Sequence, residues 1–291
     1  MAPGRITTTA QQVKHAGMIA RKGIVPHVRA VQSVVEDRVN PALARLAPYR
    51  FDPARYRRSF LAWPAPELGP PVDYEPRVFT FWTGDNDLTP NRRASLERMR
   101  ETIGLPVVLV TPDTLPDWIV PNHPLHAAYQ HLSLVHRSDY LRAYFLHHHG
   151  GGYCDIKQPV ESWAAAAQSL RDHPDTWLLA SPVEHASWVG RHPGRLGADL
   201  RRHYRLIGAS GSFLGRAGNP LTAEWVRELD RRLDYFAPQL AAFPGEIRGE
   251  VVGYPISWNV LLNHVLHPLC LKHHEHVRTD PRLRLSLLDY L

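Results

Sequence analysis

Apolar residues recur at two different spacings along the chain, and these spacings predict the order of its helices and strands. In residues 24–46 they lie three or four positions apart, as on one face of a helix. Residues 77–84 and 105–112 are short β-branched and aromatic runs, which predict buried strands. Between them, Thr89 and the proline after it open a helix that we expect to run through Glu101. The order strand, helix, strand indicates an α/β domain with a parallel sheet.

The second half of the chain continues this alternation. Residues 132–149 have an apolar side at helical spacing, and we expect the glycines at 150–152 to end this helix. A short strand at residues 153–156 should follow, before Pro159. The other expected elements are strands at 176–183 and 204–216, a helix at 220–236, a loop at 238–255 and a last helix from residue 256 to the region of Pro268.

A proline-rich stretch divides the chain. Residues 63–76, with the sequence WPAPELGPPVDYEP, contain five prolines, and we expect an extended linker there. The predicted organisation is an N-terminal basic helical segment of residues 1–62, the linker, and an α/β catalytic domain of residues 77–291.

The composition is that of a folded protein with a substantial core, because 44% of the 291 residues are hydrophobic and 21% are charged. No apolar run approaches the roughly 18 residues of a membrane-spanning helix, and the N-terminus lacks the apolar region of a signal peptide. Cys154 and Cys270 are too few for a disulfide framework or for a zinc site made of cysteines. We therefore expect a cytoplasmic protein.

The excess positive charge is concentrated at the N-terminus. Residues 1–50 hold eight Lys and Arg against two acidic residues, so they account for the whole net charge of +6. The other residues hold 26 basic and 26 acidic side chains, and a neutral body argues against binding to nucleic acid. Two interpretations of residues 1–50 stay open: a solvated helical face, or peripheral contact with anionic lipid at the inner face of a membrane or with another anionic partner.

The candidate chemistry lies in residues 136–157, HRSDYLRAYFLHHHGGGYCDIK. Asp139 and Arg142 are three positions apart on the predicted helix and therefore share a face. Asp155 ends the next strand, where open α/β sheets bind ligands. Paired acidic and basic groups suit sugar hydroxyls, and a diphosphate leaving group needs positive charge from side chains or a cation. A sugar nucleotide fits this set, and the alternative is a helical salt bridge beside a surface turn.

The motif Ser138-Asp139-x-x-Arg142, followed by an aromatic and aliphatic helix and by Gly-Gly-x-Tyr-x-Asp ending at Asp155, resembles a family of glycosyltransferases that contain an Asp-x-Asp motif. The family includes yeast initiating mannosyltransferases, the glucosylating clostridial toxins and capsular polysaccharide synthesis proteins. Weaker similarity extends over residues 77–275, in the segments FTFWTG, GASGSFLGRAGNP and GYPISWNVLLNHVLHPLCL.

This resemblance implies a GT-A fold, which is a Rossmann-like α/β domain. It also implies transfer of a hexose from a nucleotide sugar, with a UDP-sugar as the expected donor, to a hydroxyl acceptor with retention of configuration. By position, Trp82 would stack on the donor's base, and Asp139 and Arg142 would hold hydroxyls of the donor sugar. Asp155 would lie near the ribose, the sugar and a metal. The other expected donor-binding residues are Thr83, Ser138, Gly151, Gly152, Ser257, Trp258 and Asn259.

The sequence departs from the family pattern at Lys157, which stands where the family has its second, metal-binding aspartate. A charged lysine cannot coordinate a cation, so dependence on Mn²⁺ or Mg²⁺ is in doubt. Three alternatives stay open: Asp155 binds a metal with other ligands, Lys157 supplies part of the metal's charge, or the chain is a weakly active or inactive nucleotide-sugar-binding scaffold. The expected catalytic set is Asp139, Arg142, Asp155 and Lys157.

Three consecutive histidines, at 147–149, raise the separate hypothesis of a His-rich metalloprotein. Successive residues of a helix point about 100° apart, so three in a row cannot all face one ion. We expect a solvated helix end, where the helix dipole favours histidine.

Overall fold

The computed structural model describes residues 37–68 and 74–286. Residues 37–46 are helical, which confirms the end of the helix expected at 24–46, and its earlier residues lie outside the described part. Within the expected linker, residues 63–68 and 74–76 form neither helix nor strand. Among the described residues, none of the helices is long and apolar enough to cross a membrane.

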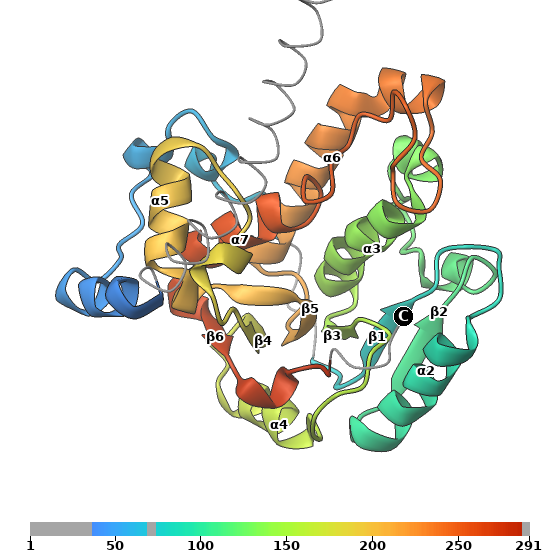
Figure 1. The fold of residues 1–291 in the computed structure, drawn as a ribbon, viewed down its shortest axis with the longest axis horizontal. Coiled ribbons are helices and arrows are strands. Elements are labelled where there is room, and N and C mark those ends of the chain that lie inside the picture. Colours follow the sequence, from blue (N-terminus) through green and yellow to red (C-terminus); the bar gives the residue numbers. More distant parts are fainter. Residues whose placement is uncertain (1–36, 69–73, 287–291) are drawn as a thin grey trace, which may run out of the picture.

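Within the described residues, a six-stranded sheet runs in the order β2-β1-β3-β5-β4-β6 (Figure 1). Strand β1 is parallel to β2 and β3, and β4 is parallel to β6, whereas β5 is antiparallel to both β3 and β4. The sheet is therefore mixed: the expected parallel pairing is confirmed for β1, β2 and β3, and the antiparallel β5 departs from it. The apolar pattern of a buried strand is the same in either direction, so it could not reveal this reversal. The strands are β1 (Val78–Phe81), β2 (Val107–Val110), β3 (Gly151–Cys154), β4 (Leu178–Pro182), β5 (Gly208–Gly215) and β6 (Val277–Thr279).

Several helices begin where the sequence supplies a capping side chain. Thr89 and Ser133 each accept a hydrogen bond from a backbone N–H of the first turn, and Asn219 forms a reciprocal capping box with Thr222. These caps fix the starts of three helices. The helices are α2 (Pro90–Thr102), α3 (Leu134–His148), α4 (Ala164–Asp172), α5 (Gly194–Arg202), α6 (Pro220–Ala242) and α7 (Asn263–Lys272).

The last two helices differ from expectation. Helix α6 continues through Pro238 to Ala242, and α7 starts at Asn263 and continues through Pro268. Proline removes one backbone donor, but packing of an apolar face supplies most of a helix's stability. Leu240, after the first proline, is fully buried, so packing keeps the backbone helical there.

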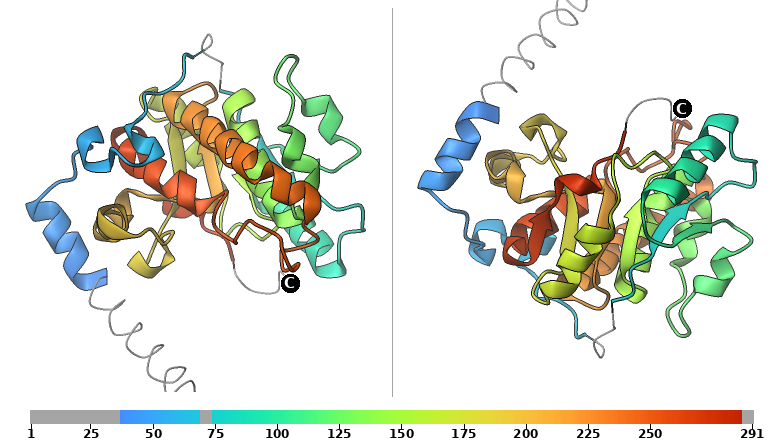
Figure 2. Two further views of the ribbon diagram at one scale, coloured as in Figure 1. Left: turned by 90° about the horizontal axis from the view of Figure 1, so that it is seen from above. Right: turned by 90° about the horizontal axis from the view of Figure 1, so that it is seen from below.

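Helices cover both faces of the sheet, as Figures 1 and 2 show, with α3, α6 and α7 on one face and α2 and α4 on the other. Side chains alternate between the faces along each strand. Phe79 and Phe81 of β1 pack in the core with α3, α6 and α7, whereas Val78 packs with α2 and α4. The structure is thus an α/β fold with helices on both faces of one sheet.

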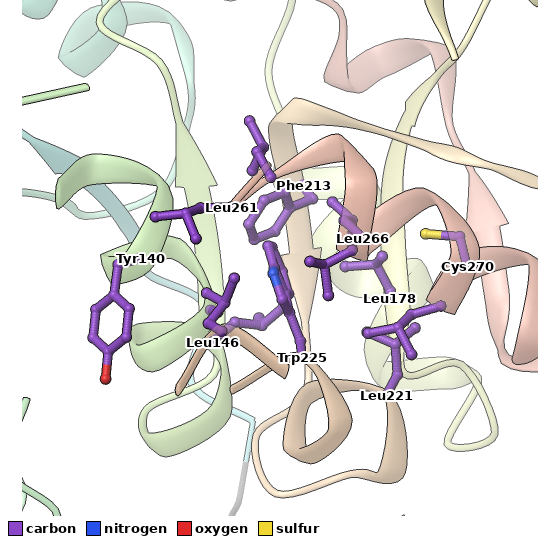
Figure 3. Packing of buried hydrophobic residues seen from close by; sticks show 14 of the residues in the cluster. Tyr140, Leu146, Leu178, Phe213, Leu221, Trp225, Leu261, Leu266 and Cys270 are labelled. Carbon is purple, nitrogen blue, oxygen red and sulfur yellow. The ribbon is translucent and has the colours of Figure 1, made fainter. Parts of the chain in front are cut away.

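The larger core lies beneath α3, α6 and α7 (Figure 3). Trp225 of α6 and Phe213 of β5 meet there, with ring centroids 6.2 Å apart. Leu146 of α3 and Leu266 of α7 belong to the same cluster. Burial of each such side chain contributes about 1.5–3 kcal/mol, so this core holds α3 firmly against the centre of the sheet.

Part of the predicted N-terminal segment belongs to this core as well. Tyr56 donates a hydrogen bond to the Asp199 carboxylate of α5 at 2.8 Å, and Arg55 pairs with the same carboxylate at 3.0 Å. The division expected at residue 62 therefore does not separate two cores. The buried residues of this part are Tyr49, Tyr56, Phe60 and Leu61, and its 3-10 turns are η1 (Pro53–Tyr56) and η2 (Phe60–Ala62).

Candidate active site

Asp155 directly follows β3 at the centre of the sheet, and both its backbone and its side chain are held in place. Its N–H donates to the Gly211 carbonyl of β5 at 2.8 Å. Its carboxylate accepts hydrogen bonds from the Tyr153 hydroxyl at 2.9 Å and from the Lys157 ammonium at 3.0 Å. The side chain keeps 23% of its surface exposed, so this carboxylate is fixed and still accessible from solvent.

Arg142 of α3 connects the helix to this carboxylate. Its Nη2 lies 3.1 Å from Oδ1 of Asp155 and 3.6 Å from Oδ1 of Asp139. Its Nη1 donates to the Ser210 carbonyl at 3.0 Å, and its guanidinium lies 4.3 Å from the centroid of the Tyr153 ring. The structure therefore brings together the four side chains that the sequence analysis placed in the catalytic set.

The two carboxyls of this cluster have different protonation behaviour. Asp139 is only 2% exposed, and burial raises its pKa to about 7, although Arg142 opposes the shift. The 3.6 Å separation is too long for a hydrogen bond to offset that burial. Burial would also raise the pKa of Asp155, but Arg142 and Lys157 together lower it below its usual value. Near neutral pH the site thus holds one firmly ionised carboxylate and one that exchanges its proton.

The turn after Asp155 is surrounded by cationic side chains. The Lys157 N–H donates to the Asp155 carbonyl at 2.6 Å, which folds the ammonium back toward the carboxylate. Arg92, in the first turn of α2, donates to the Ile156 carbonyl at 2.8 Å. Together with Arg142, these groups place three positive charges around one ionised carboxylate. A positive environment of this kind suits a diphosphate.

Trp82 and Thr83 follow β1 at the same edge of the sheet, because β1 and β3 are parallel. The Trp82 indole N–H donates to the Asn86 carbonyl at 2.5 Å, and its ring is partly buried against the core beneath α2 and α4. Thr83 donates to the Leu134 carbonyl at 2.7 Å, at the start of α3. Both residues therefore lie on the segment that follows β1, at the edge of the sheet where Asp155 lies. Neither forms a hydrogen bond with Asp155 in the described structure.

Ser138 joins the cluster indirectly. Its hydroxyl lies 3.4 Å from the hydroxyl of Tyr153, which in turn donates to Asp155. Ser138 thus borders the site from α3.

Gly151 and Gly152 have a packing role in the sheet. Gly152 pairs with Val78 and Leu214, and a Cβ there would lie 2.7 Å from the Phe213 carbonyl oxygen. Gly151 has φ of +82°, and a Cβ there would lie 2.7 Å from the Arg77 carbonyl oxygen. Strand β3 begins at Gly151, two residues before the strand expected at 153–156. Of the three glycines, only Gly150 ends α3. Both glycines are buried within β3, and close packing accounts for them.

Residues 243–262 form a loop that crosses the N-terminal end of α3. The Tyr254 hydroxyl lies 2.8 Å from Nδ1 of His136 and accepts from the Ser133 N–H at 3.1 Å. Burial lowers the pKa of His136 to about 4. Hydrogen bonding to the backbone of Ser257 and Trp258 beside its ring opposes this shift. Ser257 and Trp258 are therefore one helical turn from Asp139, and the Trp258 side chain is exposed.

Trp258 and Asn259 are placed differently on this loop. Trp258 keeps 58% of its surface exposed, whereas the Asn259 side chain lies 3.4 Å from that of Asn263 at the start of α7. Of the three expected C-terminal residues, Ser257 and Trp258 therefore lie beside His136 of α3, whereas Asn259 lies at the start of α7.

The same loop closes the N-terminus of α3. The Leu134 N–H donates to the Glu246 carbonyl at 2.8 Å, and the Val135 N–H donates to the Ile247 carbonyl at 3.2 Å. These amides would otherwise form an anion-binding helix end. Negative charge on a ligand must therefore be met by the cationic side chains around Asp155.

Sequence reasoning overlooked two residues of this site. Tyr153 bridges Ser138, Arg142 and Asp155, and the signal for it was present, because residues two apart on a strand share a face. Arg92 starts the helix that follows β1, and its position depends on the parallel pairing of β1 and β3. Only a correct strand order could have placed it at the site.

The rings of the three consecutive histidines turn in different directions. His147 Nδ1 lies 3.0 Å from the Thr222 hydroxyl, and His149 Nε2 lies 2.8 Å from the Trp118 carbonyl. The His148 ring packs against the Tyr144 ring, 4.4 Å between centroids. Over residues 37–68 and 74–286, His, Cys, Asp and Glu form no group of three or more that could hold a metal ion.

No protein-family model matches the chain. A search of curated proteins finds no match either.

Proposed function

We propose that this chain is a glycosyltransferase with a GT-A fold, which transfers a hexose from a UDP-sugar to a hydroxyl acceptor with retention of configuration. The observation that carries the proposal is the position of Arg142, between Asp139 and Asp155 at the carboxyl end of a central strand. An α/β sheet binds ligands at this edge. The spacing of these residues and the likeness to Asp-x-Asp glycosyltransferases support the same chemistry.

In the proposed reaction, the acceptor oxygen forms a bond to the anomeric carbon while the bond from that carbon to the β-phosphate oxygen breaks. The electron pair of the broken bond stays on UDP, and the acceptor proton passes to the departing phosphate. Asp139 and Arg142 hold hydroxyls of the donor sugar. Lys157 and Arg92 stabilise the negative charge that develops on the diphosphate.

The residues around Asp155 do not fit a divalent cation in the described arrangement. Its carboxylate already accepts from the Tyr153 hydroxyl and the Lys157 ammonium, and Arg142 lies 3.1 Å away. A cation bound there would lie beside two positive side chains, which repel it. We therefore propose that Lys157 and its cationic neighbours supply the positive charge for the leaving group.

The test is release of UDP from a panel of UDP-sugars by the full chain, with and without acceptor mixtures, in EDTA and in Mn²⁺. We expect release in EDTA and a loss of roughly a hundredfold or more in Asp155→Asn. Asp113→Asn is a matched control, because Asp113 is an exposed aspartate after β2 at the same edge of the sheet. Equal activity in Asp155→Asn and the control would contradict the proposal.

The ion pair between Lys157 and Asp155 also favours a second candidate function, a nucleotide-sugar-binding scaffold without turnover. In that case Lys157 stays paired with the Asp155 carboxylate, and the carboxylate takes no part in a reaction. Binding of UDP-sugars by calorimetry, with no release of UDP under any of the conditions above, would support this scaffold function over the transferase.

A further inference from the structure

The helix at residues 37–46 lies at the periphery of the molecule, on the far side of the sheet from α2 (Figures 1 and 2). Its inner face carries small and polar residues. The Asn40 amide donates to the Arg201 carbonyl of α5 at 3.0 Å, and the Asp37 carboxylate accepts from the Ala186 N–H at 2.8 Å. The polar side of this helix is thus the side that rests on the protein.

The outer face of the same helix carries its apolar residues. Val39, Leu43 and Leu46 are spaced four and three positions apart, so they form one stripe. They are 43%, 40% and 84% exposed, respectively. A helix that rests on a protein core normally turns such a stripe inward. Here the apolar stripe faces away from the core.

Exposed arginines lie on this helix and on the part of the protein beneath it. Arg38 and Arg45 lie on the helix itself, and Arg202 and Arg205 lie on the adjacent end of α5 and on the 3-10 turn η6 (Tyr204–Leu206). Arg45, Arg202 and Arg205 also line a cavity of about 300 Å³ beneath the helix. The helix therefore exposes both apolar side chains and arginines, and further exposed arginines lie beneath it.

An exposed tryptophan lies near the N-terminal end of this helix. Trp188 is 55% exposed, and its ring packs against the His185 ring. His185 Nδ1 lies 2.8 Å from the Asp37 carboxylate at the start of the helix. Tryptophan is enriched where proteins meet the boundary between water and lipid.

We propose that the helix at 37–46, together with Arg202, Arg205 and Trp188, is a docking surface for an anionic phospholipid membrane. Val39, Leu43 and Leu46 enter the interfacial region, while the arginines contact lipid phosphates. Charge complementarity selects this occupant, because a second copy of the chain would bring two sets of arginines together. The proposal does not depend on the transferase activity.

The test is co-sedimentation of the full chain with vesicles of phosphatidylcholine and phosphatidylserine, and with vesicles of phosphatidylcholine alone. We expect binding to the anionic vesicles that weakens with added salt, and little binding to the neutral ones. Replacing Arg38, Arg45 and Arg202 together by Gln should weaken binding roughly a hundredfold, at about fivefold for each arginine. Leu43→Ser/Leu46→Ser should also abolish most of the binding.

Matched controls lie on α2 and α4, on the face of the sheet opposite α3, α6 and α7. Replacing the exposed Arg93 and Arg100 of α2 and Arg171 of α4 by Gln removes the same charge and should leave binding within about twofold of the wild type. Equal binding to neutral vesicles, equal losses in both arginine variants, or full binding by Leu43→Ser/Leu46→Ser would overturn the proposal. A change of oligomeric state in Leu43→Ser/Leu46→Ser by sedimentation velocity, with vesicle binding intact, would assign the surface to a second copy instead.

Discussion

The Lys157 ammonium donates a hydrogen bond to the Asp155 carboxylate at 3.0 Å, across the short turn that follows β3. At the position where an Asp-x-Asp motif would present a second carboxylate, this chain presents a cation in contact with the first. The charge of the motif changes from two negative groups to a pair of opposite sign. This pair offers a ligand one cation and one anion side by side.

Removing this charge should weaken binding of the diphosphate. Lys157→Met keeps the length of the side chain, and we expect it to lower the affinity for UDP about 30-fold, because a hydrogen bond from a charged donor contributes about 2 kcal/mol. Isothermal calorimetry with UDP measures the change. Lys157→Arg is the control, because it keeps the charge and should keep most of the affinity. Unchanged affinity in Lys157→Met would show that the lysine does not meet the diphosphate.

Restoring a carboxylate at this position should create dependence on metal. In Lys157→Asp we expect UDP binding to be weak in EDTA and to recover with Mn²⁺, because two carboxylates can share a divalent cation. The wild type should bind UDP equally in both conditions. Thermal-shift measurements at saturating UDP compare the four combinations. Stabilisation of the wild type by UDP only in Mn²⁺ would contradict a site that uses Lys157 in place of a metal.

The carboxyl of Asp139 should make stability depend on pH. Burial raises its pKa from the usual 3.8 to about 7, so between these values the folded protein holds a proton that the unfolded chain has lost. Stability from this group is full below pH 4 and falls as pH rises toward 7, by an amount on the order of 4 kcal/mol. Asp139→Asn removes this dependence and should therefore gain stability relative to the wild type between pH 5 and pH 8.

Urea denaturation of both proteins at the two pH values measures this effect. Asp113→Asn, at an exposed position, should track the wild type at both. A stability difference between wild type and Asp139→Asn that is the same at pH 5 and pH 8 would show that Asp139 is already ionised in the folded protein.

Substitutions at two glycines should distinguish a role in packing from a role in donor binding. A Cβ at Gly152 would lie 2.5 Å from Cδ2 of Leu214, so we expect Gly152→Ala to lower stability by about 1–3 kcal/mol. A Cβ at Gly211 would lie 3.1 Å from Oδ2 of Asp155 on the open edge of the site, so Gly211→Ala should reduce donor affinity instead. Thermal melts and UDP calorimetry on both variants test this contrast. If Gly152→Ala were as stable as the wild type but bound UDP more weakly, Gly152 would belong to the donor site and not only to the packing of the sheet.

The loop at 243–262 should depend on its hydrogen bonds to α3. Tyr254→Phe removes the hydroxyl that accepts from the Ser133 N–H, and leaving this buried N–H unpaired costs about 1–3 kcal/mol. We expect faster cleavage of this loop by proteases, located by mass spectrometry. Tyr235→Phe, at a residue 77% exposed, is the control. Equal cleavage of the two variants would show that other contacts hold the loop.

Much of the fold was predictable because its signals are local. The cap at Thr89 and the glycine at 150 fix helix ends through neighbouring residues, and the structure confirms them. Proline was a poorer guide, since α6 and α7 continue through Pro238 and Pro268 where packing is strong. Tertiary packing of this kind outweighs the local tendency of proline to end a helix.

The sequence by itself determined that Asp139 and Arg142 share a helix face and that Asp155 ends a strand, because helical and strand spacings are properties of the backbone. Only the tertiary structure decided the direction of β5, which brings the Ser210 and Gly211 carbonyls against the site. It also decided that residues 243–262 cross α3 and that the apolar stripe of residues 37–46 faces outward. These outcomes depend on which distant surfaces meet, and a local pattern of apolar and polar residues is the same whichever surface it meets.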